Sequence, residues 1–363
     1  MTAGGAPRAL LAWYQGARRD LPWRRRRDPY AVWLSEVMLQ QTRVRQVVGY
    51  WRRFLRRFPT VETLAAASEE EVMALWSGLG YYRRARQLHR AARQLTRDGW
   101  PTDAAGLRRL PGVGEYTAAA VASIAFGEAV PVLDGNVARL LARRLALRQP
   151  VTRVAARRRL RQAAAELLDR ERPGDSNQAL MELGATVCTP RRPACAACPL
   201  AVGCRAREEG TPEAYPVRAG RRRPSPRAAV AALVAEGSRV LLFRRGEGDA
   251  LLGGSWEVPW VEAASAVAAG RALAARYGGR WRLGVALGTV RHAITWRQLT
   301  VAVRAAERVA EDGGEGVAEG LEAGWFTPSQ VLALPRSSLV GKVLALRPPH
   351  PVSGRGPARR RRG

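Results

Sequence analysis

The chain has 363 residues, 47% of them apolar and 25% charged, a size and composition that favour two globular domains. Basic residues number 60 against 31 acidic ones, and the net charge of +29 favours a polyanionic partner, nucleic acid before an anionic membrane. The only lysine, Lys342, lies far from every motif described below, which argues against a lysine Schiff base. No apolar run approaches the roughly 20 residues that cross a bilayer, so we expect a cytoplasmic protein.

The first half of the chain is predicted to be all-α. Apolar residues recur three and four positions apart from residue 28 to about residue 184, and glycine and proline turn signals separate the stretches. The predicted helices are 31–48, 50–57, 69–76, 83–96, 116–126, 137–147 and 153–169.

The second half is predicted to be a smaller α+β domain. A stretch rich in proline, glycine and arginine is typical of a linker, and strand-like runs with one helical stretch, 263–277, follow it. The predicted strands are 228–235, 240–243, 283–290 and 295–305. The expected organisation is an all-α domain over 1–205, a linker over 206–227, an α+β domain over 228–347 and a disordered basic tail over 348–363.

A glycine-rich turn lies between two predicted helices. Gly112 and Gly114 flank Val113, and this pattern allows a partner to approach backbone N–H groups at the start of a helix, where a phosphate is stabilised. The turn is typical of a helix-hairpin-helix element, which holds the DNA backbone without reading its sequence. An ordinary connection with glycine as helix cap is the alternative.

All four cysteines lie close together. Cys188, Cys195, Cys198 and Cys204 follow the spacing C-x6-C-x2-C-x5-C, which allows four thiolates to surround one ion or cluster. Spacing alone leaves zinc and an iron–sulfur cluster open. Either centre is expected to be structural, since hydrolysis needs no electron transfer.

Two carboxyl groups have the environments that glycosidic bond cleavage needs. Glu36 lies among apolar residues, so burial is expected to raise its pKa and make it a general acid; a surface glutamate on an amphipathic helix is the alternative. Asp134 precedes a predicted helix, where an aspartate is an ordinary N-cap and also a carboxylate held ionised. One protonated and one ionised carboxyl are the usual pair for an oxocarbenium-like transition state.

Together these motifs resemble the helix-hairpin-helix glycosylase superfamily, which includes endonuclease III, and within it the adenine DNA glycosylases of the MutY family. This family carries the same hairpin, a downstream aspartate and a cysteine loop that binds a [4Fe–4S] cluster. The matching segments are 21–24, 28–30, 33–42, 78–82, 110–117, 133–137 and 177–190.

The resemblance implies excision of adenine mispaired with 8-oxoguanine or guanine in double-stranded DNA, by a bacterial, nucleoid-associated monomer that flips the base into a pocket. It implies that Glu36 protonates adenine N7 and that Asp134 stabilises the oxocarbenium ion. The remaining implied site residues are Tyr116 and Asn136 in support of catalysis, Arg24 and Glu182 at the adenine, and Gln40, Gln41, Thr42, Tyr81, Gly112, Val113 and Gly114 at the DNA. Of these, Gln41 and Tyr81 are implied to wedge into the base stack near the oxidised guanine.

Tyr116 departs from the wider superfamily. Bifunctional members carry their Schiff-base lysine at this hairpin position, and tyrosine forms no imine. We therefore predict a monofunctional glycosylase. The alternatives are a pyrimidine-damage glycosylase with lyase activity and a non-catalytic DNA-binding module, and the presence of both Glu36 and Asp134 argues against the module.

The second domain resembles a Nudix-like domain through residues 253–259. Ala272, Ala275 and Arg276 stand where a Nudix hydrolase carries metal-binding carboxylates, so we predict no pyrophosphatase activity. The resemblance implies instead that this domain covers the oxidised guanine, with Thr295 able to hydrogen-bond a purine edge and Trp296 in place of the family's histidine. Ordinary strand positions are the alternative for both residues.

Overall fold

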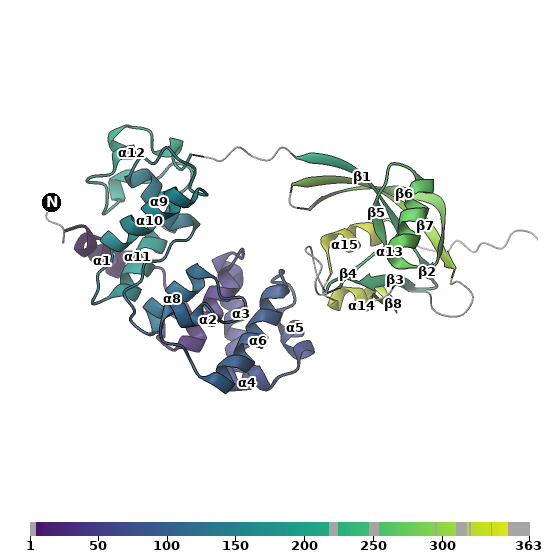
Figure 1. Ribbon diagram of the computed structural model, residues 1–363, viewed down its shortest axis with the longest axis horizontal. Helices are drawn as coiled ribbons and strands as arrows, with labels where there is room; N and C mark the ends of the chain where they lie inside the picture. Colours follow the sequence, from purple (N-terminus) through teal and green to yellow (C-terminus); the bar gives the residue numbers. More distant parts are fainter. Residues whose placement is uncertain are drawn as a thin grey trace, which may run out of the picture. The chain divides into compact units, whose positions relative to one another are not determined.

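The computed structural model describes residues 5–217, 224–246, 254–294, 296–309, 318, 321–334 and 336–347. These residues form two compact units that divide near residue 221, each with its own colours in Figure 1. No described helix is both long and apolar enough to span a bilayer.

The first unit is helical throughout, as the sequence predicts. Buried apolar residues at helical spacing form its interior, and polar side chains cap several helix starts; the Asp28 side chain, for example, accepts a hydrogen bond from the backbone N–H of Ala31 at 2.8 Å. The helices are α1 (Gly5–Ala17), α2 (Pro29–Leu39), α3 (Val44–Arg57), α4 (Val61–Ala66), α5 (Glu69–Trp76), α6 (Arg83–Asp98), α7 (Ala104–Leu107), α8 (Glu115–Ala125), α9 (Gly135–Arg144), α10 (Val154–Glu166), α11 (Pro173–Thr186) and α12 (Arg205–Glu208), with 3-10 turns η1 (Pro22–Arg25), η2 (Cys195–Ala197) and η3 (Pro212–Ala214).

The predicted helix 31–48 is wrong in one respect, because the structure breaks it into α2 and α3. The break is a sharp turn at residues 40–43, where Gln41 takes a left-handed φ of 58°. Apolar periodicity continues on both sides of this turn and therefore does not reveal it. The sequence analysis also did not predict helices α1, α4, α7, α11 and α12.

The first unit contains two hydrophobic cores that share α8. One core packs α2 to α7 against Ala118, Val121 and Ala122, and the other packs α1, α9, α10 and α11 against Ala119 and Ala120. Alanines on opposite sides of α8 let both sets of helices approach closely. The cavity described below is lined from both sides of this seam.

The expected linker 206–227 is shorter in the structure. Helix α12 contacts α9, and buried Arg143 donates a hydrogen bond from Nε to the carbonyl of Tyr215 at 3.1 Å, so residues 205–217 belong to the first unit. Strand β1 already begins at Ser225. Proline and glycine content alone does not distinguish a loop that folds onto a domain from a free linker.

The second unit has an α+β fold, as predicted, with two four-stranded sheets. One sheet has the order β5-β1-β7-β6, with β1 and β7 parallel. In the other sheet β3 pairs with each of the other strands, β2, β4 and β8. Four short strands, β2, β4, β5 and β8, were not predicted, because a few residues show little alternation. The elements are β1 (Ser225–Leu233), β2 (Ala235–Glu236), β3 (Arg239–Arg244), β4 (Trp256–Glu257), β5 (Trp260–Glu262), α13 (Ala266–Tyr277), β6 (Arg280–Ile294), β7 (Arg297–Val309), β8 (Glu322–Phe326), α14 (Pro328–Ala333) and α15 (Ser338–Leu344).

Alternate side chains of β1 build two cores in the second unit. Ala229, Ala231 and Leu233 face the core that includes α15, and Val230 and Ala232 face the core that includes α13. Successive side chains of a strand point to opposite faces of the sheet, and in β1 both faces are buried. The sequence of this strand is therefore a continuous apolar run. The expected tail over 348–363 lies outside the described residues.

Candidate active site and cysteine loop

A cavity of about 580 Å³ lies in the first unit and contains most of the predicted catalytic residues. Its walls come from η1 and α2 on one side and from α8, α9 and α11 on the other, so residues far apart in sequence meet there. The predicted site residues that line it are Arg24, Glu36, Gln40, Gln41, Thr42, Tyr116, Asp134, Asn136 and Glu182.

Glu36 is a buried carboxyl in the wall of the cavity. It lies on α2 and is 5% exposed. Burial disfavours its anion and raises its pKa to about 7, against a hydrogen bond from Tyr116; the neighbouring charge of Asp134 adds to the rise. A carboxyl with a pKa near neutrality can hold a proton and transfer it at physiological pH.

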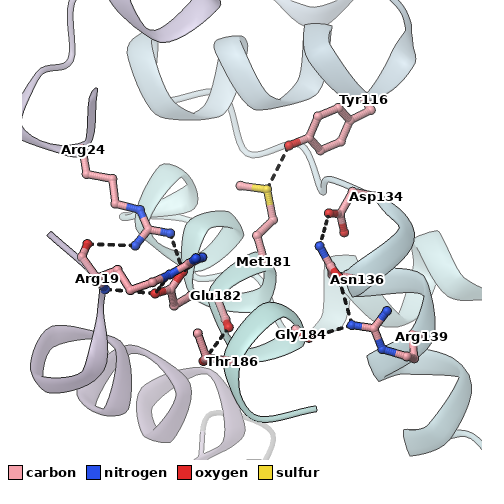
Figure 2. Close-up of polar contacts among 10 residues, drawn as sticks. All are labelled: Arg19, Arg24, Tyr116, Asp134, Asn136, Arg139, Met181, Glu182, Gly184 and Thr186. Carbon is pink, nitrogen blue, oxygen red and sulfur yellow. Dashed lines mark hydrogen bonds and ion pairs between the residues drawn. The ribbon is translucent and has the colours of Figure 1, made fainter. Parts of the chain in front are cut away.

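Tyr116 connects α8 to Glu36 and to α11. Its hydroxyl donates a hydrogen bond to Glu36 Oε2 at 2.7 Å and lies 3.0 Å from the sulfur of Met181, a contact drawn in Figure 2. The carboxyl oxygen is the stronger acceptor, so the phenolic proton points to Glu36. Burial and the two nearby acids raise the pKa of Tyr116, and its hydroxyl therefore stays protonated.

Asp134 is the N-cap of α9, and it also faces the cavity. Its Oδ1 accepts a hydrogen bond from the backbone N–H of Val137 at 2.7 Å, and its Oδ2 accepts one from Asn136 Nδ2 at 3.0 Å. The Asp134 side chain therefore both caps α9 and lines the cavity. Burial raises the pKa of Asp134, while these hydrogen bonds and the helix N-terminus favour its anion.

The buried carboxylate of Glu182 forms ion pairs with Arg24 and with Arg19, whose side chain is 41% exposed, in the wall of the cavity (Figure 2). Its Oε1 accepts from Arg19 N at 2.9 Å and Arg19 Nε at 2.8 Å, and its Oε2 accepts from Arg19 Nη2 at 2.8 Å and Arg24 Nη2 at 2.7 Å. Burial opposes the anion of Glu182, but these hydrogen bonds prevail and lower its pKa to about 2. All four acceptor positions of the carboxylate are therefore occupied.

The sequence analysis missed Arg19 as a cavity residue. Arg19 lies between α1 and η1, 163 positions from Glu182, in a run of arginines that carries no periodic signal. The one signal that could have indicated Arg19 is its place two positions before segment 21–24, which matches the glycosylase family.

Several predicted DNA-contact residues lie outside the cavity lining. The Tyr81 side chain is 63% exposed, and Gly112 adopts a φ of 76°, which favours glycine in the hairpin before α8. Gly114 is the N-cap of α8. The Val113 side chain is buried in the core, and its N–H donates to the carbonyl of Leu110 at 3.2 Å; contact of this residue with DNA stays a prediction.

The four cysteines, all half-buried and unpaired, line one small cavity beside α9. Four thiols with no competing acidic or imidazole ligand in that lining are a donor set for an iron–sulfur cluster or a zinc ion. Among the described residues no three potential ligands already stand in metal-binding geometry.

Three arginines of α9 bind the cysteine loop, and one of them, Arg144, donates from Nη1 to the carbonyls of Leu200 and Val202 at 3.1 and 3.2 Å. Arg143 is buried and donates from Nη1 to Cys188 Sγ at 3.3 Å and to the carbonyl of Thr189 at 2.7 Å. Arg139 donates from Nε to the carbonyl of Cys188 at 2.9 Å and from Nη2 to Asn136 Oδ1 at 2.9 Å. A continuous chain of hydrogen bonds thus runs from Asp134 through Asn136 and Arg139 to the cysteine loop.

In the second unit, a buried glutamate is neutralised internally. Glu257, 3% exposed, accepts hydrogen bonds from Tyr277 Oη at 2.8 Å and Arg276 Nη2 at 3.1 Å, and Arg245 lies 3.4 Å away. Helix α13 contains neither aspartate nor glutamate. Thr295 lies outside the described residues; Arg297 stacks over Trp296 with its guanidinium carbon 5.4 Å from the ring centre.

Models of two protein families match this chain. Residues 34–166 match the HhH-GPD superfamily base excision DNA repair proteins, and residues 229–346 match the NUDIX domain. The first unit is an HhH-GPD domain. The second is a NUDIX domain, and both halves of the predicted fold class are thereby confirmed.

Curated relatives of the chain are adenine DNA glycosylases. The human protein is 51% identical over 212 residues, which cover 55% of this chain and 39% of that protein. The Arabidopsis thaliana protein is 42% identical over 295 residues, covering 69% and 46%, and a Mycobacterium tuberculosis protein is 46% identical over 195 residues, covering 53% and 64%. In each of these comparisons, the segment that matches this chain makes up less than two thirds of the relative's length.

A solved structure supports the fold of the HhH-GPD domain. A thermostable thymine-DNA glycosylase is 28% identical, with a TM-score of 0.52, and the match covers 56% of this chain and 95% of that one. This likeness places the helical half of the chain among DNA glycosylase folds.

Proposed function

We propose that this chain is a monofunctional adenine DNA glycosylase of base excision repair, acting on adenine opposite 8-oxoguanine or guanine in double-stranded DNA. The observation that carries the proposal is the meeting of Glu36, Tyr116 and Asp134 in one cavity, with a pKa near 7 at Glu36. The adenine-specific relatives and the HhH-GPD match support the same substrate class.

The two carboxyls supply complementary chemistry for hydrolysis of the N-glycosidic bond. Protonated Glu36 delivers its proton to adenine N7, which turns a poor leaving group into a better one as the C–N bond breaks. The sugar then carries oxocarbenium character, and the Asp134 anion, fixed by Val137 and Asn136, stabilises this positive charge. Ionised Glu36 afterwards accepts a proton from the attacking water.

The residues around Glu36 argue for hydrolysis without strand cleavage. Tyr116 occupies the hairpin position and hydrogen-bonds to Glu36, and no lysine is available in the HhH-GPD domain to attack the sugar. The product is then an intact abasic site. Arg24 and Glu182 would bind the extruded adenine, and Gln40, Gln41, Thr42 and Tyr81 would contact the duplex near the vacated position.

We further propose a [4Fe–4S] cluster held by Cys188, Cys195, Cys198 and Cys204. Their location in one cavity and the Arg143 hydrogen bond to Cys188 Sγ support four thiolates around one centre. Such a centre would tie down a loop that has little core of its own. The NUDIX domain, whose α13 lacks acidic ligands, would bind DNA over the oxidised guanine rather than hydrolyse a nucleotide.

Excision from a labelled duplex tests the function. With adenine opposite 8-oxoguanine, strand breaks that appear only after hot alkali support the proposal; breaks without alkali indicate a lyase, and no breaks indicate a non-catalytic DNA-binding module. Glu36→Gln should abolish release of adenine while duplex binding survives, and Glu62→Gln, an exposed residue of α4, is the matched control. Release of adenine by Glu36→Gln would refute the acid assignment.

A parallel assay tests the preferred mispair. Adenine opposite guanine and adenine opposite 8-oxoguanine should both be substrates, with faster excision opposite 8-oxoguanine. Equal rates would show that the oxidised base is not recognised. A colourless purified protein containing zinc would contradict the iron–sulfur assignment.

A further inference from the structure

Gln41 and Tyr81, both exposed, are two of the four residues other than glycine that have left-handed backbone among the described residues; the others are Ala146 and Arg192. Gln41 has a φ of 58° in the turn between α2 and α3, and Tyr81 has a φ of 50° in the turn between α5 and α6. Residues other than glycine adopt this conformation at a cost in free energy, and such residues cluster at functional sites. Something must hold both turns in this conformation.

The guanidinium of Arg84 lies between the two turns and bonds to both. Its Nη1 donates to the carbonyls of Val37 and Met38 at 3.0 Å each and to the carbonyl of Gln40, at the end of α2. Its Nη2 donates to Thr42 Oγ1 at 3.1 Å and, on the other turn, to the carbonyls of Leu79 and Gly80 at 3.3 and 3.2 Å. One side chain therefore contacts the backbone directly before Gln41, the Thr42 side chain directly after it, and the backbone directly before Tyr81.

The environment of Arg84 indicates a structural clamp rather than a surface charge. The residue is 9% exposed, and within the described part of the chain no carboxylate forms an ion pair with it. Its charge instead faces the carbonyls that end α2, the negative end of the helix dipole. The rings of Trp76 and Tyr81 lie 5.3 and 5.5 Å from its guanidinium carbon, so Tyr81 itself stacks on the clamp.

We propose that Arg84 is a positioning residue that joins the turns of Gln41 and Tyr81 into one rigid two-pronged wedge for opening the duplex. The inference rests on the proposed function, since it assigns the wedge to extrusion of the adenine. A wedge must resist the restacking of the bases it separates, and two independent turns on strained backbone would yield. The clamp fixes both prongs at a constant spacing before DNA binds, so little ordering remains to oppose extrusion.

The test separates base extrusion from bond cleavage. Arg84→Ala and Arg84→Lys are compared with Arg86→Ala, a matched control on the same helix. Arg86 is also buried, at 7% exposure, and its guanidinium pairs with Glu69. Single-turnover excision from a duplex with adenine opposite 8-oxoguanine should fall by about tenfold or more for Arg84→Ala. Arg84→Lys, which keeps the charge but fewer donors, should be intermediate, and the pH profile should keep its shape.

Fluorescence of 2-aminopurine placed at the adenine position reports extrusion directly, in proteins that also carry Glu36→Gln so that no base is released. At saturating protein, verified by anisotropy, the fluorescence rise should be lost with Arg84→Ala and kept with Arg86→Ala. Equal behaviour of the Arg84→Ala and Arg86→Ala proteins would overturn the role of Arg84. Absence of adenine release by the unsubstituted chain would refute the proposed function. Absence of a fluorescence rise with the Glu36→Gln protein that keeps Arg84 would refute the wedge.

Discussion

Replacement of Tyr116 by phenylalanine should move the pH dependence of excision in a predictable direction. The Tyr116 hydroxyl donates to Glu36 Oε2 at 2.7 Å, and this hydrogen bond favours the Glu36 anion. Phenylalanine keeps the ring and its packing while it removes the donor. The pKa of Glu36 should therefore rise beyond about 7, because burial then acts with less opposition.

The size of the change follows from the strength of the lost bond. A hydrogen bond to a charged acceptor contributes about 1.5–3 kcal/mol, and one pKa unit corresponds to about 1.36 kcal/mol. The pKa of Glu36 should thus increase by roughly one to two units. In the proposed mechanism Glu36 acts in its protonated form, so activity is present below its pKa and lost as the pH rises through it. The higher pKa in Tyr116→Phe then moves this loss to more alkaline pH.

Single-turnover excision measured from pH 5 to pH 10 checks the prediction, since it isolates the chemical step from product release. In Tyr116→Phe the alkaline limb of the pH–rate profile should move to higher pH, whatever happens to the maximal rate. Glu115→Gln, at the exposed neighbouring position, is the control and should keep the limb of the unsubstituted protein. An alkaline limb that stays in place or moves to lower pH would refute the assignment of Glu36 as the acid that Tyr116 tunes.

Four further outcomes follow from the structure. The pKa of Glu36 rises from 4.5 to about 7 on folding, so its negative charge destabilises the folded protein progressively above pH 4.5. Glu36→Gln should therefore increase the free energy of unfolding by up to about 3 kcal/mol at pH 8 and by much less at pH 5. An equal increase at both pH values, measured by urea titration, would contradict this. Borohydride should trap no covalent complex with abasic DNA, because the only lysine, Lys342, lies in the NUDIX domain; a trapped adduct would indicate lyase chemistry. Arg139→Ala should both slow excision and speed the loss of iron from the proposed [4Fe–4S] cluster to a chelator by about tenfold or more, because it breaks charged hydrogen bonds to Asn136 and Cys188; a change in only one of the two rates would show that the two sites are not joined. Incubation of the full chain with Mg²⁺ and nucleoside triphosphates should release no pyrophosphate, since α13 has no acidic ligand, and measured release would overturn the assignment of the NUDIX domain to DNA binding.

The sequence predicted the acids of the site better than their partners. Glu36 and Asp134 stand in short segments whose apolar or capping context already determines their environment, and both line the same cavity. Arg19 and Met181 come from segments with no such context, and only the packing of α11 against α1 and α8 brings them to the site. A contact between residues 163 positions apart leaves no local trace in one sequence.

The fold shows the same division. Long amphipathic helices and the long strands β1, β6 and β7 were predicted because their periodicity extends over many residues. The break at Gln41 and the short strands were not, because each depends on one backbone angle or on a pairing partner supplied by distant residues. The clamp of Arg84 belongs to this second group: an arginine in an arginine-rich helix gains its meaning only from the carbonyls around it.

In the proposed adenine site, entry of a base would exchange hydrogen-bond partners at Glu182, because all four acceptor positions of its carboxylate are already occupied. An incoming donor must replace an N–H of Arg19 or Arg24, so a purine amine trades one hydrogen bond for another at little net cost. A purine that presents a carbonyl at the same edge would set an acceptor against an anion and leave the displaced arginine unmatched. The discrimination between amino and oxo purines would then come from the penalty for the wrong base rather than from extra attraction for the right one.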